Sequence, residues 1–336
     1  MRHFVIAGVL VIAVAILAYM GLNAVHLMPV EASTQSVSID WMWNLMLMAM
    51  SFLFALIAVP MFYSLVVFKR KKGDTTDAKH IEGNTPLEIT WTVIPLFVVI
   101  IFAYLGAGNL ADVVRSTPGA MVVKVSAIQW QWSFQYPDYG GFTSSELYLP
   151  VNKAVHLEMT STDVIHSFWV PEFRVKQDLV PGRVTELQIT PTLAGNYKVR
   201  CSELCGTGHY KMEQPVIIVD NAKFTAWVAD QQAIAAKQQA TPEGRGQKIY
   251  ETYCIACHSI DGSVGIAPTW QGLYGSQVKL ADGTTVTAND DYILNSIKTP
   301  EAQVVSGFSA MSFKYQTAGI TVDQLTDILA YIKTLK

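Results

Sequence analysis

Side chains that bind soft metals gather in one twelve-residue stretch, Cys201-Ser-Glu-Leu-Cys-Gly-Thr-Gly-His-Tyr-Lys-Met212. Two thiols, an imidazole and a thioether occur there, at Cys201, Cys205, His209 and Met212. Thiolates and thioethers select copper, and imidazole suits copper too. A second imidazole is available at His166, between two runs of alternating polarity, where we expect a strand to end. One loop plus one distant strand end is the blue-copper arrangement, and two cysteines would let two sulfurs bridge two coppers.

Two other interpretations of the cysteine pair are open on spacing alone. Cys201 and Cys205 could form a structural disulfide if this part of the chain lies outside the cytoplasm. They could also belong to a zinc site. The thioether of Met212 and the distant His166 favour copper over both.

A second motif, Cys254-Ile-Ala-Cys257-His258, has the C-x-x-C-H pattern of covalent haem c attachment. The two cysteines would form thioethers and His258 would be the proximal iron ligand. A redox dithiol is the alternative, but the motif ends an expected helix about ten residues into a new domain. Met/His ligation is the cytochrome c arrangement. Met311 is the one methionine after His258, and no histidine follows, so Met311 is the candidate sixth ligand rather than a core methionine.

Composition indicates a membrane protein with soluble parts. The chain has 336 residues, 51% hydrophobic and 15% charged, with a formal net charge of -3. Apart from one short loop, the chain has no long run of basic residues of the kind that binds nucleic acid. The four cysteines fall into the two motifs and leave none for another disulfide.

Three apolar segments, at about residues 4–20, 41–68 and 86–108, are long enough to span a bilayer. The basic run Lys69-Arg-Lys-Lys72 places the loop at 69–85 in the cytoplasm. Everything after about Ala111 would then lie outside it. We expect residues 1–22 to be either a signal peptide or a retained first helix, and residues 40–112 to be a transmembrane hairpin. Thr85-Pro-Leu-Glu88 is typical of a capping box opening the last span.

The remaining chain should position the two motifs. Residues 115–223 alternate apolar and polar side chains in short runs, which predicts a sandwich or barrel. Trp130 and Trp132 would share one face of a strand, where core packing is the usual role of tryptophan. An Ala- and Gln-rich segment at 224–243 reads as a partly helical linker. Residues 244–336 would form an all-α haem domain closed by a helix near Thr321–Leu335.

The copper stretch resembles the dinuclear copper (CuA) loop of cytochrome c oxidase subunit II. Further matching motifs are Asn84-Thr-Pro-Leu-Glu88, Gln129-Trp-Gln-Trp-Ser133, Asp163-Val-Ile-His166, Lys176-Gln-Asp178 and Pro181-Gly-Arg183. The resemblance covers roughly residues 40–230. It implies N-terminal transmembrane helices, an all-β cupredoxin Greek-key domain and, with the second motif, a C-terminal all-α class I cytochrome c domain.

The resemblance also implies roles for single residues. The metal ligands would be His166, Cys201, the carbonyl of Glu203, Cys205, His209 and Met212. Trp130 would be where electrons enter, and Glu88 would lie near the entrance of a proton path into subunit I. The Pro268 carbonyl would accept the free N–H of His258. The Glu203 side chain could hold magnesium at the interface with subunit I, near which Asp163 and Asp178 would lie.

The function implied is electron input to a respiratory haem-copper oxidase that reduces oxygen to water and pumps protons. Electrons would pass from haem c to CuA and on to subunit I, with no oxygen chemistry in this chain alone. Expected partners are subunit I, subunit III, the bilayer of a bacterial inner membrane, and a donor such as a cytochrome c, a small copper protein or an upstream respiratory complex. The copper and haem domains would be extracytoplasmic. The alternatives are a subunit of a nitric oxide reductase-like enzyme and a copper-delivery protein. Gln129 and Ser312 depart from the common pattern without removing a ligand.

Overall fold

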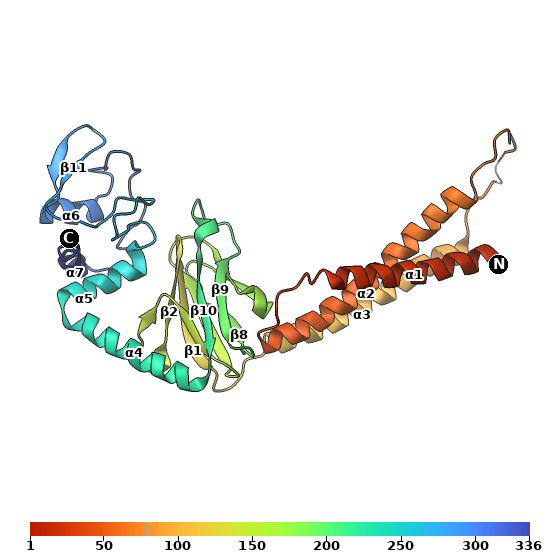
Figure 1. Ribbon diagram of the computed structural model, residues 1–336, viewed down its shortest axis with the longest axis horizontal. Helices are drawn as coiled ribbons and strands as arrows, with labels where there is room; N and C mark the ends of the chain where they lie inside the picture. Colours follow the sequence, from red (N-terminus) through yellow and green to blue (C-terminus); the bar gives the residue numbers. More distant parts are fainter. Residues whose placement is uncertain (78–79) are drawn as a thin grey trace. The chain divides into compact units, whose positions relative to one another are not determined.

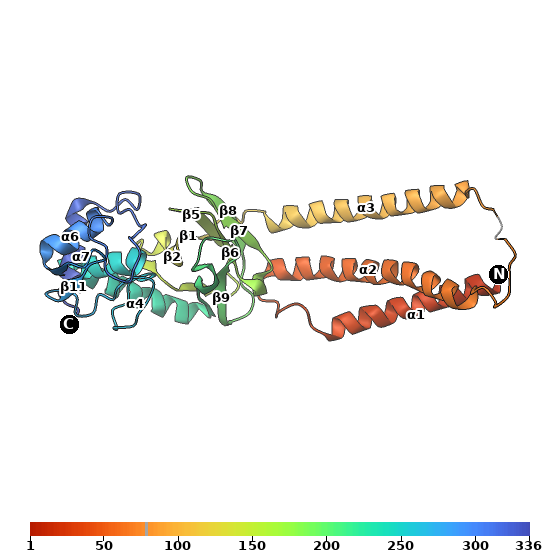
Figure 2. The ribbon, with the colours of Figure 1, turned by 90° about the horizontal axis from the view of Figure 1, so that it is seen from above.

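The computed structural model describes residues 1–77 and 80–336. It divides into two compact units, Met1–Arg115 and Ser116–Lys336. Figures 1 and 2 show helices in the first unit, and two sheets followed by further helices in the second. Each unit has its own chemistry, so each is described by itself.

The first unit consists of three long apolar helices, α1 (Arg2–Ala24), α2 (Thr34–Val67) and α3 (Thr85–Val113). All three are long and apolar enough to cross a membrane. Helices α1 and α2 lie side by side (Figure 2). Near one end of the pair, the His3 Nδ1 atom lies 2.8 Å from the Tyr63 hydroxyl.

Polar side chains define the ends of these helices. Asn109 of α3 donates to the Ser38 carbonyl of α2 at 2.9 Å, a bond that links two helices where lipid offers no partner. The cap of α3 is Asn84, one residue before the expected Thr85. Its side chain accepts from the Leu87 backbone N–H, and its backbone N–H donates to Glu88 Oε1 at 3.0 Å. The helix is therefore capped in both directions, as in a capping box, but the cap lies one residue earlier than expected.

Two five-stranded sheets make up the first half of the second unit. One has the order β3-β2-β1-β5-β8, and the other has the order β4-β10-β9-β6-β7. Their bounds are β1 Met121–Ile128, β2 Gln131–Gln135, β3 Thr143–Ser144, β4 Leu147–Pro150, β5 Val155–Ser161, β6 His166–Trp169, β7 Lys176–Leu179, β8 Thr185–Ile189, β9 Gly195–Cys201 and β10 Glu213–Val219. Short helical turns occur at η1 Pro137–Tyr139, η2 Pro171–Phe173 and η3 His209–Lys211. Strands β1 and β5 pair in parallel, as do β4 and β10, while the other neighbours are antiparallel.

The sandwich core follows from strict alternation along the central strands. Every second residue of β1 and β5 is buried, which places one face of each strand against the opposite sheet. Trp132, Phe134 and Phe168 are fully buried between the sheets. This dense packing gives the strands that carry the metal motif a rigid frame.

Helix α4 (Asn221–Ala240) occupies most of the expected linker, but its first half packs on the sandwich. Phe224 and Val228 are buried, and the Trp227 ring stacks on Tyr148 with centroids 4.4 Å apart. Burial of these rings makes the start of α4 part of the β domain. From its composition, this segment is expected only to be a partly stiff connection.

The haem motif lies in a small helical region. Its elements are α5 Pro242–Ile249, the π-helical turn η4 Tyr250–Cys254, β11 Gln277–Lys279, β12 Thr285–Thr287, α6 Asp290–Lys298 and α7 Val322–Ile332. A two-stranded β11–β12 sheet therefore accompanies the helices expected from the sequence.

Helices α5 and α7 cross closely at Gly246. A Cβ atom at Gly246 would lie 1.9 Å from the Asp327 carbonyl oxygen, so only glycine fits this crossing. Beside it, Arg245 makes two hydrogen bonds to the Asp327 carboxylate, at 2.9 and 2.7 Å. The expected terminal helix thus packs on the helix that leads into the C-x-x-C-H motif.

Candidate metal and haem sites

Strand pairing brings the distant metal motif together. His166 begins β6 and Cys201 ends β9, and β6 pairs with β9 at Phe168 and Cys201. The loop after β9 then carries Cys205. His209 begins η3, and Met212 lies between η3 and β10. The antiparallel β9–β10 pair closes this loop at its base.

The donor atoms converge as a small cluster. The Sγ atoms of Cys201 and Cys205 are 3.7 Å apart. Cys201 Sγ lies 3.9 Å from His166 Nδ1 and 3.2 Å from the Glu203 carbonyl oxygen. Cys205 Sγ lies 3.5 Å from His209 Nδ1 and 3.8 Å from Met212 Sδ. Two thiols at the centre, with an imidazole and a weaker donor beside each, form a donor set that suits copper.

The two thiols have different pKa values, because they lie together in one buried site and the charge on one disfavours a charge on the other. Burial favours the neutral form of Cys201, but hydrogen bonds involving His166 and the Ser167 backbone lower its pKa to about 6. Burial and the neighbouring Cys201 charge raise the pKa of Cys205 to about 12. A bound metal must displace the second proton, so metal binding at this pair releases acid.

A second layer of contacts orients His166. Its Nε2 atom lies 2.9 Å from Asp163 Oδ1, and Asp163 Oδ2 accepts from the Gln129 backbone N–H at 2.7 Å. The Trp132 ring meets the His166 ring edge-on at 6.3 Å. With Nε2 held by the carboxylate, Nδ1 is the ring nitrogen free to bind a metal.

Trp130 lies beside the cysteine loop but outside the strand expected for it. It occupies the turn before β2 and is half-buried, whereas Trp132 in β2 is fully buried. The two rings therefore do not share a strand face. Trp130 Nε1 donates to the Cys205 carbonyl at 3.2 Å, and Gln129 Nε2 donates to the same oxygen at 2.7 Å. The sequence motif did not indicate this hydrogen bond between Gln129 and the Cys205 carbonyl.

The haem motif is also arranged for iron. His258 Nδ1 lies 2.7 Å from the Pro268 carbonyl oxygen, which leaves Nε2 for a metal. Burial lowers the pKa of His258, so the ring is held in the neutral form that ligates metals. Cys254 and Cys257 are both free thiols. Met311 lies in the loop whose Phe313 ring packs on Tyr253 at 6.1 Å, beside the helical turn that carries Cys254.

Two aromatic contacts around His258 were not anticipated from the sequence. The Trp270 ring lies 5.1 Å from the imidazole, and the Tyr250 hydroxyl donates to the His258 carbonyl at 2.9 Å. Trp270 and Tyr250 also pack on each other at 5.1 Å. In the sequence, only the closeness of Tyr250 and Trp270 to the C-x-x-C-H motif points to these contacts.

Other expected residues do not join either cluster. Glu88 is an exposed residue of α3 in the first unit. The side chains of Glu203 and Asp178 are exposed. Among the described residues, the one group of three His, Cys, Asp or Glu side chains with converging ligand atoms is His166, Cys201 and Cys205.

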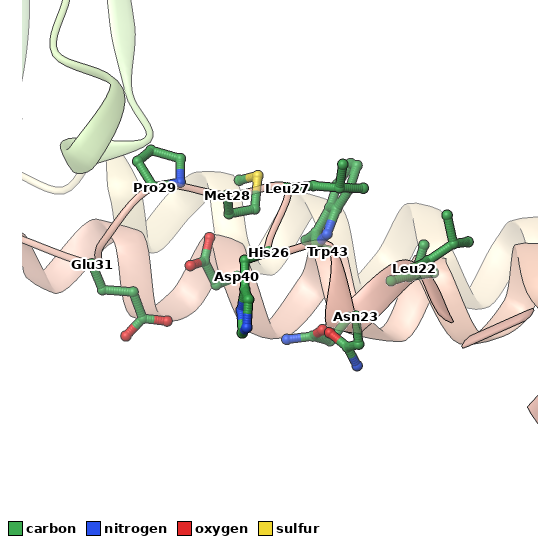
Figure 3. A pocket seen from close by; sticks show the side chains of 11 residues that line it. Leu22, Asn23, His26, Leu27, Met28, Pro29, Glu31, Asp40 and Trp43 are labelled. Carbon is green, nitrogen blue, oxygen red and sulfur yellow. The ribbon is translucent and has the colours of Figure 1, made fainter. Parts of the chain in front are cut away.

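A separate cavity of about 220 Å³ lies in the first unit (Figure 3). Asn23, His26, Asp40 and Trp43 are among the residues that line it. None of the expected metal or haem residues does so.

Comparison with known proteins accounts for most of the chain. The family model of the cytochrome c oxidase subunit II transmembrane domain matches residues 18–106, and that of its periplasmic domain matches residues 143–221. The cytochrome c model matches residues 244–336. Cytochrome c oxidase subunit 2 of Thermostichus vulcanus is 34% identical, over 67% of this chain and 84% of that protein. The chain belongs to the cytochrome c oxidase subunit II family.

Three further known proteins are similar to this chain. Cytochrome c oxidase subunit 2 of Alkalihalophilus pseudofirmus is 29% identical, with 88% of each chain covered. The crystallised periplasmic domain of subunit II from Bradyrhizobium japonicum is 33% identical, with a TM-score of 0.34, over 35% of this chain and 98% of that one. A haem-copper terminal oxidase solved by cryo-electron microscopy is 24% identical over 40% of this chain and 99% of that one, with a TM-score of 0.33.

The family membership confirms the expected fold class. This subunit II has N-terminal apolar helices, a cupredoxin-like β domain and a C-terminal cytochrome c domain. These domains imply a copper centre and a haem c, and the apolar helices fit a membrane-anchored protein.

Proposed function

We propose that this subunit II passes electrons from haem c to a dinuclear copper centre and on to an oxygen-reducing subunit I. The observation that carries the proposal is the convergence of five side chains, from His166, Cys201, Cys205, His209 and Met212, with the Glu203 carbonyl beside Cys201. When bound, copper and haem iron supply the one-electron redox chemistry. The chain's own residues hold these groups and shield them from water.

Each residue then has a specific task. The two thiolates would hold the coppers, and the carboxylate of Asp163 keeps His166 in the orientation that presents Nδ1. The β6–β9 and β9–β10 pairs would limit movement of the ligands between redox states. Cys254 and Cys257 would anchor the haem, Met311 would be the sixth ligand, and the Pro268 carbonyl fixes the ring of His258.

The location and partners follow from the same family. We place the three helices in a bacterial inner membrane, with both redox domains outside the cytoplasm, and subunits I and III beside them. The external donor would be a cytochrome c, a small copper protein or an upstream respiratory complex. Residues 1–22 would be a retained span, because α1 packs along α2 as one of three membrane-length helices.

A thiol reductase is a further proposed partner during assembly. One solved relative is a subunit II in a mixed disulfide with a thioredoxin-like protein. Here the two Sγ atoms lie 3.7 Å apart as free thiols, so a small approach would allow oxidation to a disulfide. Reduction by such a partner would restore the thiols before copper binds.

The test is the cofactor content of the full chain, expressed with haem maturation and copper and purified in detergent. We expect two coppers and one covalent haem per chain, with a mixed-valence copper EPR signal. A Met212→Leu variant should keep its haem and lose the normal copper spectrum. One labile copper, or zinc, in the unmodified chain would contradict the relay and favour copper delivery.

A further inference from the structure

The cytochrome c domain contacts the copper domain at Glu251, which lies three positions before Cys254. Gln131 of β2 donates from Nε2 to the backbone carbonyl of Glu251 at 2.5 Å. Gln131 is buried, with 6% of its surface exposed, so water competes little for this bond.

The side chain of Glu251 is held from two other helices. Gln238 of α4 donates to Oε2 at 3.2 Å, and Gln247 of α5 donates to Oε1 at 2.8 Å. Three glutamines, from the sheet, the connecting helix and the haem domain, therefore meet at one residue. We call Gln131, Gln238 and Glu251 the glutamine latch, because the bond from Gln247 stays within the haem domain.

The connection that leads to the latch is closely packed. Trp227 stacks on Tyr148 and fastens α4 to the sandwich. Figure 1 shows the chain turning back after α4 into α5. At this elbow a Cβ atom on Gly244 would lie 2.5 Å from the Gln238 carbonyl oxygen, so α5 approaches α4 as closely as glycine allows.

The latch lies between the two redox motifs. On one side, Gln131 stands between Trp130, which donates to the Cys205 carbonyl, and Trp132, which contacts His166. On the other side, Glu251 belongs to the same π-helical turn as Cys254. Electron tunnelling slows steeply with distance, so a contact here sets the separation of the two centres.

We infer that Gln131 and Gln238 are positioning residues that hold the haem domain against β2, and that haem-to-copper transfer occurs within this one docked arrangement. This inference rests on the proposed function. It replaces a mobile tether, which would raise only the effective concentration of the donor, with a fixed donor–acceptor pair.

The experiment compares Gln131→Ala, Gln238→Ala and the double variant with the control Gln247→Ala, all in the intact oxidase. Gln247 is the matched control because its bond to Glu251 stays within the haem domain. The first readout is the single-turnover rate of electron passage from reduced haem c to copper. The second is hydrogen exchange of the backbone amides at 131–135 and 248–254 in the full chain. Visible spectra and midpoint potentials report whether the centres themselves are intact.

Loss of one hydrogen bond shifts the ratio of docked to undocked states by about 2–10-fold. We therefore expect Gln131→Ala and Gln238→Ala each to slow transfer by up to about tenfold, and the double variant to slow it further, with faster exchange at both segments. Potentials and the Gln247→Ala control should stay unchanged. Unaltered transfer and exchange in Gln131→Ala would overturn the inference, as would equal slowing in the control.

Failure of the proposed function would look different. In that case reduced haem c in the unmodified oxidase would not reduce copper at all. A Gly244→Ala variant gives an independent check, because it opens the elbow without touching either redox motif. Normal transfer with normal exchange in that variant would also overturn the inference.

Discussion

At the scale of single residues, Asp163 has the most consequence for the copper site. It is the one carboxylate that contacts a proposed metal ligand among the described residues, and it also ties down the Gln129 turn. Its hydrogen bonds offset the cost of half-burial and hold the pKa of the carboxyl below its usual value. The negative charge therefore stays in place to orient His166.

Asp163→Asn should weaken copper binding by about 10–100-fold, the usual effect of losing an outer partner of a ligating histidine. The measurement is copper retention by the purified full chain against a competing chelator. Asp178→Asn is the control, because that side chain is exposed. Equal retention in the two variants would show that Asp163 does not orient the ligand.

Residue types were sufficient to predict which side chains converge in the cluster, but not the groups that support them. Cysteine, histidine and methionine carry their chemistry in the side chain, so their spacing is informative. Asp163, Gln129 and Cys205 meet only because three separate loops converge at one end of the sandwich. No local pattern encodes that meeting, and the same holds for Trp270 beside His258.

At the scale of elements, α4 shows how a helix can belong to a domain that its composition does not suggest. Its Ala- and Gln-rich second half suits a connector, while Phe224, Trp227 and Val228 fasten the first half to the sheets. Trp227 contacts Tyr136, Phe142 and Tyr148, which lie far away in sequence. Sequence periodicity predicts a helix, but it does not show which surface the helix will cover.

Trp227→Ala should loosen α4 from the sandwich. Because the ring is half-buried, we expect a cost of about 2 kcal/mol, below the roughly 3–5 kcal/mol of a fully buried aromatic ring. Hydrogen exchange of the α4 amides in the full chain measures this opening. Ile234→Ala on the same helix is the control, since 46% of that side chain is exposed. Similar exchange in both variants would contradict the docking role of Trp227.

The contact between α6 and α7 should depend on pH. Asp290 lies 2.9 Å from Lys333 Nζ and accepts from the Tyr274 hydroxyl at 2.8 Å. These bonds, that to Lys333 foremost, lower the pKa of Asp290, and the same carboxylate raises the pKa of Lys333. The aspartate contribution is therefore present above its unfolded pKa of 3.8 and is lost as pH falls through the lower folded value. The lysine contribution is present below 10.5 and is lost as pH rises through its higher folded value.

Asp290→Asn tests this window. The variant should melt slightly below the unmodified chain at neutral pH, by a small margin because the pair is exposed. The difference should disappear in strong acid, where Asp290 is protonated in both states. Thermal unfolding of the haem domain, followed through its visible absorption, gives the comparison. A difference that persists at the acid end would rule out an ionic origin.

At the scale of the whole molecule, domain order was predictable from the sequence and domain contacts were not. Long apolar runs, alternating strands and C-x-x-C-H each have a length and composition that local physics recognises. The glutamine latch has none of these signals, because glutamine is an ordinary surface residue and the acceptors are the backbone carbonyl and the carboxylate of Glu251.

Turnover should be less sensitive to salt than that of an oxidase that relies on a charged soluble cytochrome. Residues 241–336 contain 7 Lys and Arg and 9 Asp and Glu, a net charge of -2, so the domain has little field to screen. The haem-to-copper step is intramolecular and should be indifferent to ionic strength. Steady-state oxygen consumption with a small uncharged reductant, measured from low to high salt, is the test. A steep decline with that reductant would show that a charged encounter limits the rate.

The packing of α4 also decides where this protein can be divided and rejoined. Composition places the seam inside the Ala- and Gln-rich segment, yet a cut before Trp227 would strip the sandwich of the aromatic side chain that covers Tyr148. A hybrid that gives this copper domain a different electron donor should therefore keep residues 221–240 with the copper domain and change partners at Thr241, the cap of α5. Module exchange at that point would preserve both cores, and the incoming domain would have to supply a new acceptor for Gln131.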